Sequence, residues 1–260
     1  MITVALVDLG ENLSISVSKL AKTLNSLQRT WAFKVVDAQP NIGNPDDEDI
    51  WYRIDRLWLE LDRHLPTQEF EFVIGLTHVR LANQDRAVGA VERDYFSLSD
   101  RDRLAVITEA MQQWNPQNKD LYQYFSFLIV GELLTLMAKI DLFHQSKELC
   151  LFDDCADRAE FSRAIQRGKI SSPCRVALQD ANVPDQAVKD ALRVLTWCRR
   201  NTAARAFKMT INDPLVSLTV GTGIGWAAGA FIGTERYRIV GFISLIIVFF
   251  IFIKNRLSSG

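Results

Sequence analysis

The sequence lacks the short motifs by which many enzymes of known mechanism are recognised. It has no H-E-x-x-H zinc-binding pattern, no G-x-S-x-G nucleophile pattern, no phosphate-binding P-loop and no C-x-x-C pair. Its three histidines, His64, His78 and His144, lie far apart in the chain. These absences exclude the usual forms of zinc-peptidase, serine-hydrolase and P-loop chemistry.

The sequence also has few cysteines, and its start does not have the pattern of a signal peptide. The four cysteines are Cys150, Cys155, Cys174 and Cys198, and the start "MITVALVDLGENLS" has no basic segment before its short apolar run. We therefore expect free thiols in a cytosolic domain. The formal net charge is -1, and residues 214–260 carry four basic and one acidic side chain, so residues 1–213 are mildly acidic. That balance excludes a surface that coats a nucleic acid duplex.

What the C-terminal region does contain is two long hydrophobic runs. Residues 214–233 carry no charge over 20 positions, and residues 239–253 read "IVGFISLIIVFFIFI". Twenty helical residues span about 30 Å, the thickness of a bilayer core. The five-residue linker "TERYR" predicts a two-span transmembrane hairpin over 214–260, preceded by a juxtamembrane helix over 184–213. A buried hairpin in a soluble protein is the alternative.

Flanking charges predict the orientation of this hairpin. Basic residues precede the first span and follow the second, and they outnumber those of the linker, which Glu235 partly offsets. The positive-inside rule then predicts a multi-pass protein of the cell inner membrane with both termini in the cytoplasm.

The first span carries glycines at every fourth position: Gly221, Gly225, Gly229 and Gly233. Glycine weakens a helix in water, but in lipid small residues allow helices to approach closely, and G-x-x-x-G repeats are typical of helix pairs. The stripe therefore predicts packing between protomers and a homo-oligomer. Packing of the first span against the second within one hairpin is the alternative.

Residues 1–183 read as an α/β domain. Apolar runs predict strands over 2–9, 32–38 and 70–77, with strand-like segments at 95–100 and 103–111. Helical spacing predicts helices over 16–31, with Ser14 as cap, over 50–65, and over 158–168 ending at Gly168. Residues 78–94 read as a surface excursion. Residues 121–143 form a long apolar helix that contains Glu132 and Lys139, so we expect a core helix rather than a third span. A last helix, over 184–209 and capped by Asp185, leads to the membrane.

The order of these segments resembles the archaemetzincins, zinc peptidases of the metzincin class. The matching stretches are "VDLG", "YRIDRLWLELDRHL", "FVIGLTHVRL", "DYFSLSDRDRLAVIT", "LIVGELLTLMAKIDLFH", "HQSKELCLFDD" and "SSPCRVAL", which together cover residues 1–178. The edge strands of the family compare with the fourth stretch and its active-site helix with the fifth. The resemblance implies a zincin-like mixed sheet with a long core helix.

The same resemblance argues against the family's activity. If Glu132 stands for the general base, the flanking ligand positions are Gly131 and Thr135, neither of which binds zinc, and a third position would be Asp141. The family's second zinc, bound by cysteines, would meet Gln145, Cys150, Ser171 and Cys174. Cys155 could substitute for one of these, and a site of cysteines with His144 stays an alternative. We expect buried thiols, Glu132 as a core carboxylate paired with a neighbour, no metal and no cofactor.

The sequence thus predicts a membrane-anchored pseudoenzyme rather than an enzyme. Its cytosolic domain would act as a sensor that binds a ligand or a protein partner, and the hairpin would oligomerise to permeabilise the membrane, an architecture that resembles effectors of bacterial anti-phage systems. The turn with Gly10, Glu11, Asn12 and Ser14 is a candidate site for a small anionic ligand. A passive membrane-tethered scaffold and a metallopeptidase with non-standard ligands are the alternatives.

Overall fold

The computed structural model describes residues 1–9, 13–36, 51–64, 69–84, 91–100, 102–110, 121–144, 148–153, 155 and 158–212. The chain divides into two compact units, Met1–Thr202 and Ala203–Gly260, and the fold below is that of the first. The predicted hairpin over 214–260, with its four glycines, lies outside the described residues, as do Gly10, Glu11 and Asn12 of the predicted ligand turn.

A five-stranded mixed sheet forms the centre of the fold. Its order is β2 (Trp31–Val36), β1 (Ile2–Asp8), β4 (Phe72–Thr77), β8 (Leu104–Thr108) and β7 (Ser97–Ser99). The first four strands are parallel, and β7 pairs antiparallel with β8 at the edge. Parallel strands covered on both faces consist of continuous apolar runs, which is why β1, β4 and β8 are readable from the sequence. The predicted mixed sheet is confirmed.

A second sheet of three strands lies where the sequence predicted a surface excursion. It has the order β3 (Trp51–Arg53), β5 (Arg80–Gln84) and β6 (Val91–Tyr95). The prediction over 78–94 was wrong because "RLANQ" and "VERDY" are short and polar, and only the pairing of the two segments makes them strands. The helix predicted from residue 50 begins only after strand β3, as α2 (Ile54–His64).

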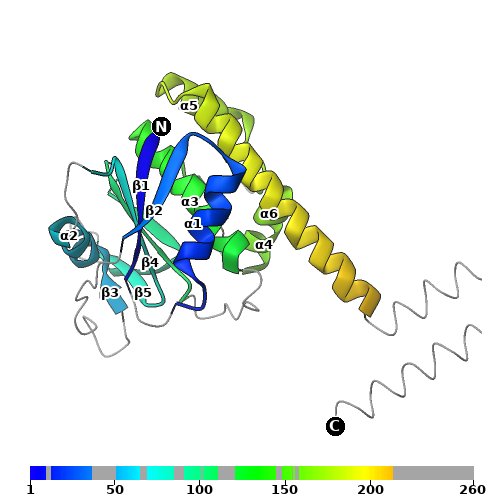
Figure 1. The fold of residues 1–260 in the computed structure, drawn as a ribbon, viewed down its shortest axis with the longest axis horizontal. Helices are drawn as coiled ribbons and strands as arrows, with labels where there is room; N and C mark the ends of the chain where they lie inside the picture. Colours follow the sequence, from blue (N-terminus) through cyan, green and yellow to red (C-terminus); the bar gives the residue numbers. More distant parts are fainter. Residues whose placement is uncertain are drawn as a thin grey trace, which may run out of the picture. The chain divides into compact units, whose positions relative to one another are not determined.

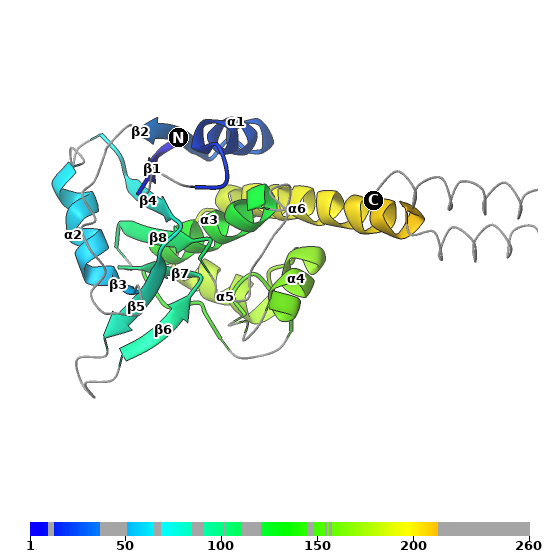
Figure 2. The same ribbon diagram turned by 90° about the horizontal axis from the view of Figure 1, so that it is seen from below.

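Helices cover both faces of the main sheet (Figures 1 and 2). Helix α2 lies on one face, and α1 (Val17–Leu27) and α3 (Leu121–Ala138) lie on the other, followed by α4 (Arg158–Arg167), α5 (Ser172–Asp180) and α6 (Asp185–Asn212). Alternate side chains of β1 serve two cores: Val4 and Leu6 join the α1–α3–α6 core, and Ala5 and Val7 join the α2 core. The sheet therefore has no solvent-facing side at β1.

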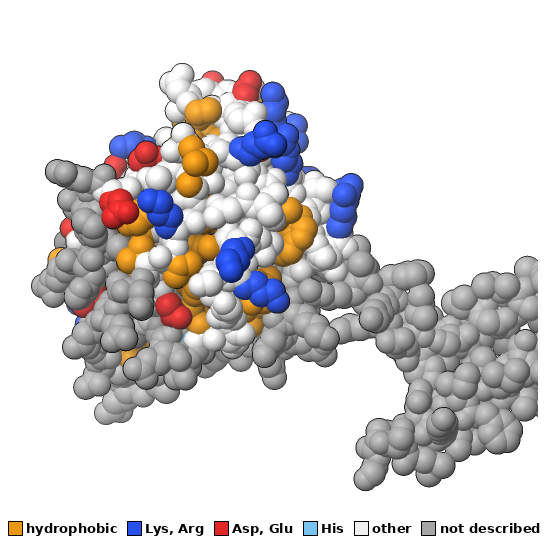
Figure 3. Space-filling model, in the orientation of Figure 1, with side chains coloured by type: hydrophobic (Ala, Val, Ile, Leu, Met, Phe, Trp, Pro, Cys, Tyr) orange, Lys and Arg blue, Asp and Glu red, His pale blue; other side chains and the backbone are white. Residues whose placement is uncertain are grey.

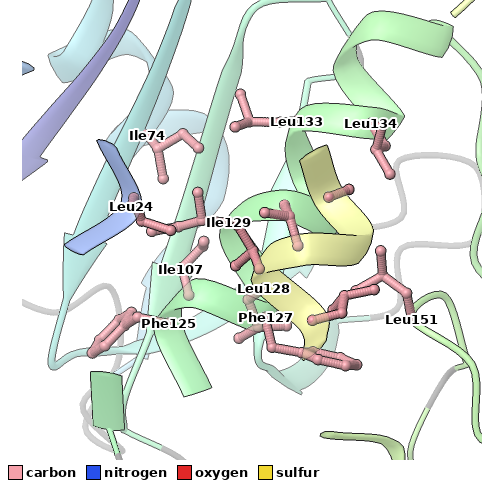
Figure 4. Packing of buried hydrophobic residues seen from close by; sticks show 14 of the residues in the cluster. Leu24, Ile74, Ile107, Phe125, Phe127, Leu128, Ile129, Leu133, Leu134 and Leu151 are labelled. Carbon is pink, nitrogen blue, oxygen red and sulfur yellow. The ribbon is translucent and has the colours of Figure 1, made fainter. Parts of the chain in front are cut away.

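Helix α3 forms the middle of the larger core. It is apolar on every side, and 16 of its 18 residues are buried. In Figure 4, side chains of the sheet (Ile74 and Ile107), of α1 (Leu24) and of the segment after α3 (Leu151) surround it. Among the described residues, this helix alone has the length and composition of a membrane span, but 89% of it is buried inside the protein. A helix that is apolar all round is a core helix when protein surrounds it, as the sequence predicted.

Several helix ends differ from the prediction. The cap of α1 is Ser16, whose Oγ accepts a hydrogen bond from the Lys19 amide at 3.3 Å, and not Ser14. Helix α3 ends at Ala138, and α6 begins at Asp185. The sequence missed α5, a short helix with a proline in its first turn. The predicted stop at Gly168 is confirmed by its left-handed φ of 52°, which glycine adopts without strain.

Asp190 links α6 to the start of β2. Its carboxylate is fully buried and accepts five hydrogen bonds. The donors are the backbone amides of Arg29 and Thr30, the hydroxyl of Thr30, the side-chain amide of Gln186 and the guanidinium of Arg193. Burial by itself raises the pKa of this carboxyl, but the hydrogen bonds outweigh burial and the pKa lies below its ordinary value. The first turns of α6 are therefore part of the domain core. On the face drawn in Figure 3, hydrophobic side chains lie in several separate areas with lysines and arginines between them.

Candidate functional site

The first candidate site is the stretch of α3 where the resemblance places a catalytic zinc. Gly131 faces the segment after α3: a Cβ built on it would lie 3.4 Å from the Cδ1 of Leu151. A side chain at position 131 would therefore begin in van der Waals contact with this leucine, which Figure 4 places beside the helix. Leu151 is itself only 3% exposed, so it has little room to move aside.

Glu132 is buried beside Gly131. It is 1% exposed, and among the residues that the structure describes neither of its carboxylate oxygens has a hydrogen-bond partner. Burial raises its pKa to about 7; the Ser97 and Ser99 hydroxyls of β7 lower it in part, although neither meets the geometry of a hydrogen bond. The prediction of a core carboxylate is confirmed, and the polar groups nearest to it are the Ser97 and Ser99 hydroxyls of β7 rather than a charged partner.

The remaining positions do not complete a metal site. Thr135 is 2% exposed and its hydroxyl has no partner among the described residues. Asp141 follows the end of α3, is exposed, and accepts a hydrogen bond from the Phe143 amide at 3.0 Å. A catalytic zinc needs three protein ligands with nitrogen, sulfur or carboxylate donors. Glycine, threonine and a surface aspartate do not fit such a zinc.

The second candidate site is a cluster of two thiols and an imidazole. His144 follows α3, Cys150 lies in the next loop, and Cys174 is in the first turn of α5. The Nε2 atom of His144 lies 3.1 Å from the Sγ atom of Cys174 and 3.4 Å from that of Cys150, and the two Sγ atoms are 3.9 Å apart. Among the described residues, these three side chains form a group that could hold a metal ion.

Asp153 orients this cluster. Its Oδ1 atom lies 3.0 Å from the Nδ1 atom of His144, and its Oδ2 atom accepts a hydrogen bond from the Leu149 amide. The backbone amide of His144 donates to the carbonyl of Phe152 at 3.0 Å, so the segments on either side of residues 145–147 lie next to each other. Sequence patterns do not single out Asp153, because its contact with His144 depends on this pairing and not on helix or strand periodicity.

The thiols of the cluster are shielded from water. Cys150 is completely buried and Cys174 is 4% exposed, whereas the side chain of His144 is 28% exposed. Burial raises the pKa of Cys174 to about 11, although the neighbouring Ser171 hydroxyl lowers it in part. None of the four cysteines is in a disulfide, as predicted, and Cys155 is not one of the three clustered residues.

Of the predicted ligand turn, the structure describes only Ser14. Its amide and hydroxyl donate to the carboxylate of Glu109, which follows β8, at 3.1 and 2.9 Å. In this conformation the Glu109 carboxylate takes the amide and hydroxyl donors of Ser14 that an anionic ligand would use.

Comparison with solved structures identifies the fold. The chain is similar to archaemetzincin from Methanopyrus kandleri, with a TM-score of 0.51 and 15% identity over 70% of this chain and 96% of that protein. It also resembles a zinc-dependent peptidase from Methanocorpusculum labreanum, with a TM-score of 0.46 and 13% identity over 67% of this chain and 99% of that one. No protein-family profile and no curated protein matches the sequence. The described domain is thus a zincin-like α/β domain, and at this identity the likeness extends to the fold alone.

Proposed function

We propose that this chain is a membrane-tethered protein without peptidase activity, a sensor and effector rather than an enzyme. Its zincin-like domain would bind a ligand or a partner in the cytoplasm, and its C-terminal hairpin would assemble with copies of itself in the inner membrane and permeabilise it. Such an architecture suits a role in bacterial anti-phage defence.

One observation carries the first half of the proposal. The positions of α3 that would supply zinc ligands hold Gly131 and Thr135, and Leu151 packs beside Gly131. A general base must also reach substrate and water. Glu132, by contrast, lies buried within the core. The packing of this region supports a domain that binds rather than cleaves.

The second half rests on the sequence of the C-terminal region. Four glycines at a spacing of four form one stripe along a predicted span of 20 uncharged residues. At 100° per residue each step of four drifts by about 40°, so the stripe winds slowly and favours a right-handed crossing of helices. A stripe longer than one G-x-x-x-G unit supports contact between protomers.

The test changes this stripe in cells. The double variant Gly225→Ile, Gly229→Ile, expressed with the trigger that activates the wild type, should no longer depolarise the membrane, and in detergent it should form smaller oligomers. The control is Ala227→Ile, which places an isoleucine on the opposite side of the helix and should leave both readouts unchanged. A double variant that depolarises cells like the wild type would refute the effector role of the stripe.

Exchange of residues 214–260 for an unrelated two-span anchor distinguishes an effector from a passive scaffold. Loss of cellular function with retained membrane insertion supports the effector. Retained function would mean that the region only anchors the domain, and the scaffold would replace the proposal.

A further inference from the structure

We propose that the outward face of α6, together with Arg29 and the end of α4, binds the phosphate headgroups of an anionic bilayer. The inference rests on the proposed function only for the membrane tether. It requires neither permeabilisation of the membrane nor the loss of peptidase activity.

Charge is divided unevenly along the chain. Residues 1–157 carry 15 lysines and arginines against 25 acidic residues, whereas residues 158–208 carry 11 against four. Most of the second stretch forms α4, α5 and α6, so the excess of positive charge lies on these helices. One of their four acids, Asp190, is fully buried. Such an asymmetry is typical of a protein that meets an anionic partner on one side.

Helix α6 presents much of this charge on a single face. Lys189, Arg193 and Arg200 follow one another at spacings of four and seven, which places them on one stripe of a helix with 3.6 residues per turn. All three are exposed, whereas Val194 and Cys198, on the opposite side, are buried in the core. At 1.5 Å per residue the stripe is about 17 Å long.

Arginines of neighbouring elements extend this stripe on both flanks. The Arg29 amide donates to the Asp190 carboxylate at 3.1 Å, which holds the exposed Arg29 beside α6. On the other flank, a Cβ built on Gly168 would lie 3.4 Å from the Cβ of Arg199, so the end of α4, with the exposed Arg167, contacts α6 there. In Figure 3, blue Lys and Arg side chains gather on the part of the molecule where α6 lies in Figure 1. The basic face consists of six residues: Arg29, Arg167, Lys189, Arg193, Arg199 and Arg200.

The chemistry of the basic face fits lipid phosphates. Five of its six residues are arginines, whose guanidinium groups hold phosphate oxygens through paired hydrogen bonds. Among the described residues, the salt bridge of this face is that of Arg193 with Asp190 at 2.6 Å, and the side chain of Arg193 is still 57% exposed. The face therefore keeps its positive charge available to an anion outside the domain.

The position of the basic face along the chain favours a bilayer over a soluble polyanion. Arg200 lies 14 residues before the uncharged run that begins at residue 214. Basic residues within about 15–20 residues of a span lie near the headgroups, and a short tether makes a weak interaction intramolecular. Residues 1–157 are acidic and repel an extended polyanion such as RNA, whereas a flat bilayer meets one face only.

The test compares two bilayers around the full-length protein, in nanodiscs of phosphatidylcholine alone or with about 30% phosphatidylglycerol. A spin label on Thr196→Cys, between Arg193 and Arg200, reports access of a neutral, water-soluble nickel chelate; the native cysteines are buried and stay unlabelled. We expect the label to lose at least about half of its access in the anionic discs and to regain it at about 1 M salt. A label on Leu59→Cys, on α2 at the other face of the sheet, should not respond.

Charge variants assign the effect to the basic face. Lys189→Gln combined with Arg200→Gln should shift the docking equilibrium about 25-fold and restore access, since each basic residue near an anionic surface contributes about fivefold. The matched control Lys34→Gln combined with Lys139→Gln removes two exposed lysines outside the face and should keep the protection. Equal loss of protection in the control would overturn the assignment to this face.

Two further measurements identify the partner and the tether. Inorganic phosphate or RNA, added to phosphatidylcholine discs, should leave access unchanged, and protection by either would overturn a lipid partner in favour of a soluble anion. Flotation with phosphatidylcholine vesicles tests the tether: a chain that does not float refutes the proposed function and this inference with it. A chain that floats but gains no protection from phosphatidylglycerol overturns the inference alone.

Discussion

The buried carboxyl of Glu132 should make the protein less stable as the pH rises, and Glu132→Gln should remove that dependence. Burial raises the pKa of this group in the folded chain to about 7, against an ordinary value of 4.5. A raised pKa means that the folded state favours the protonated acid, so stability is fully present below pH 4.5 and is lost as the pH rises towards and through 7.

The magnitude follows from the shift. A change of about 2.5 pKa units at about 1.4 kcal/mol per unit amounts to about 3 kcal/mol above pH 7, and linkage reduces it to about 1 kcal/mol at pH 5. Glutamine cannot ionise, so the difference in unfolding free energy between variant and wild type should grow by about 2 kcal/mol from pH 5 to pH 8. The comparison between two pH values cancels the constant cost of burying an amide in place of a neutral acid.

Thermal unfolding of the full-length protein in detergent, followed by tryptophan fluorescence, measures this effect. For a domain of this size about 1 kcal/mol corresponds to about 2–4 °C in Tm, so the advantage of Glu132→Gln should increase by about 4–8 °C between pH 5 and pH 8. The control Glu69→Gln makes the same change at an exposed carboxylate and should show no such trend. A Glu132→Gln protein with the pH profile of the wild type would refute the assignment of Glu132 as a buried acid with a raised pKa.

Two further predictions concern the packing of α6. Asp190→Ala should lower the free energy of unfolding by about 3–5 kcal/mol, because it leaves buried donors without an acceptor, whereas Asp180→Ala on the surface of α5 should change it by less than about 0.5 kcal/mol. Because hydrogen bonds lower the pKa of Asp190, its contribution is present above about pH 4 and is lost as the pH falls through the lower folded value; chemical denaturation that shows no such loss would contradict it. Gly168→Ala should cost about 1 kcal/mol or more, since residue 168 has a φ of 52° and a Cβ there would lie 2.8 Å from the Leu195 carbonyl oxygen; an unchanged denaturation midpoint would refute this.

The sequence was informative where burial is continuous along the chain. Strands β1, β4 and β8 and helix α3 are largely buried on both faces, so their residues form mostly apolar runs that local reasoning recognises. Strands β5 and β6 escaped prediction because their polar residues become strands only through mutual pairing. The short helix α5 escaped because a proline and a serine at its start resemble a loop.

The candidate sites show the same division. The motif comparison indicated from the sequence that Gly131 and Thr135 cannot bind zinc, because the residue types alone decide it. The surroundings of Glu132 depend on side chains from β7 and α3 together, which a single sequence does not place. His144, Cys150 and Cys174 come together only through the β-bridge between His144 and Asp153 and the packing of α5 against that segment. The contact of Asp153 with His144 is recognisable only once this bridge is known.

The central claim is that this zincin-like domain does not cleave peptides. The most direct measurement is hydrolysis of a diverse peptide library by the full-length protein supplied with zinc, followed by mass spectrometry and compared with Glu132→Gln. We predict that the two proteins produce no cleavage above background and do not differ. Zinc-dependent cleavage by the wild type that disappears in Glu132→Gln would contradict the account.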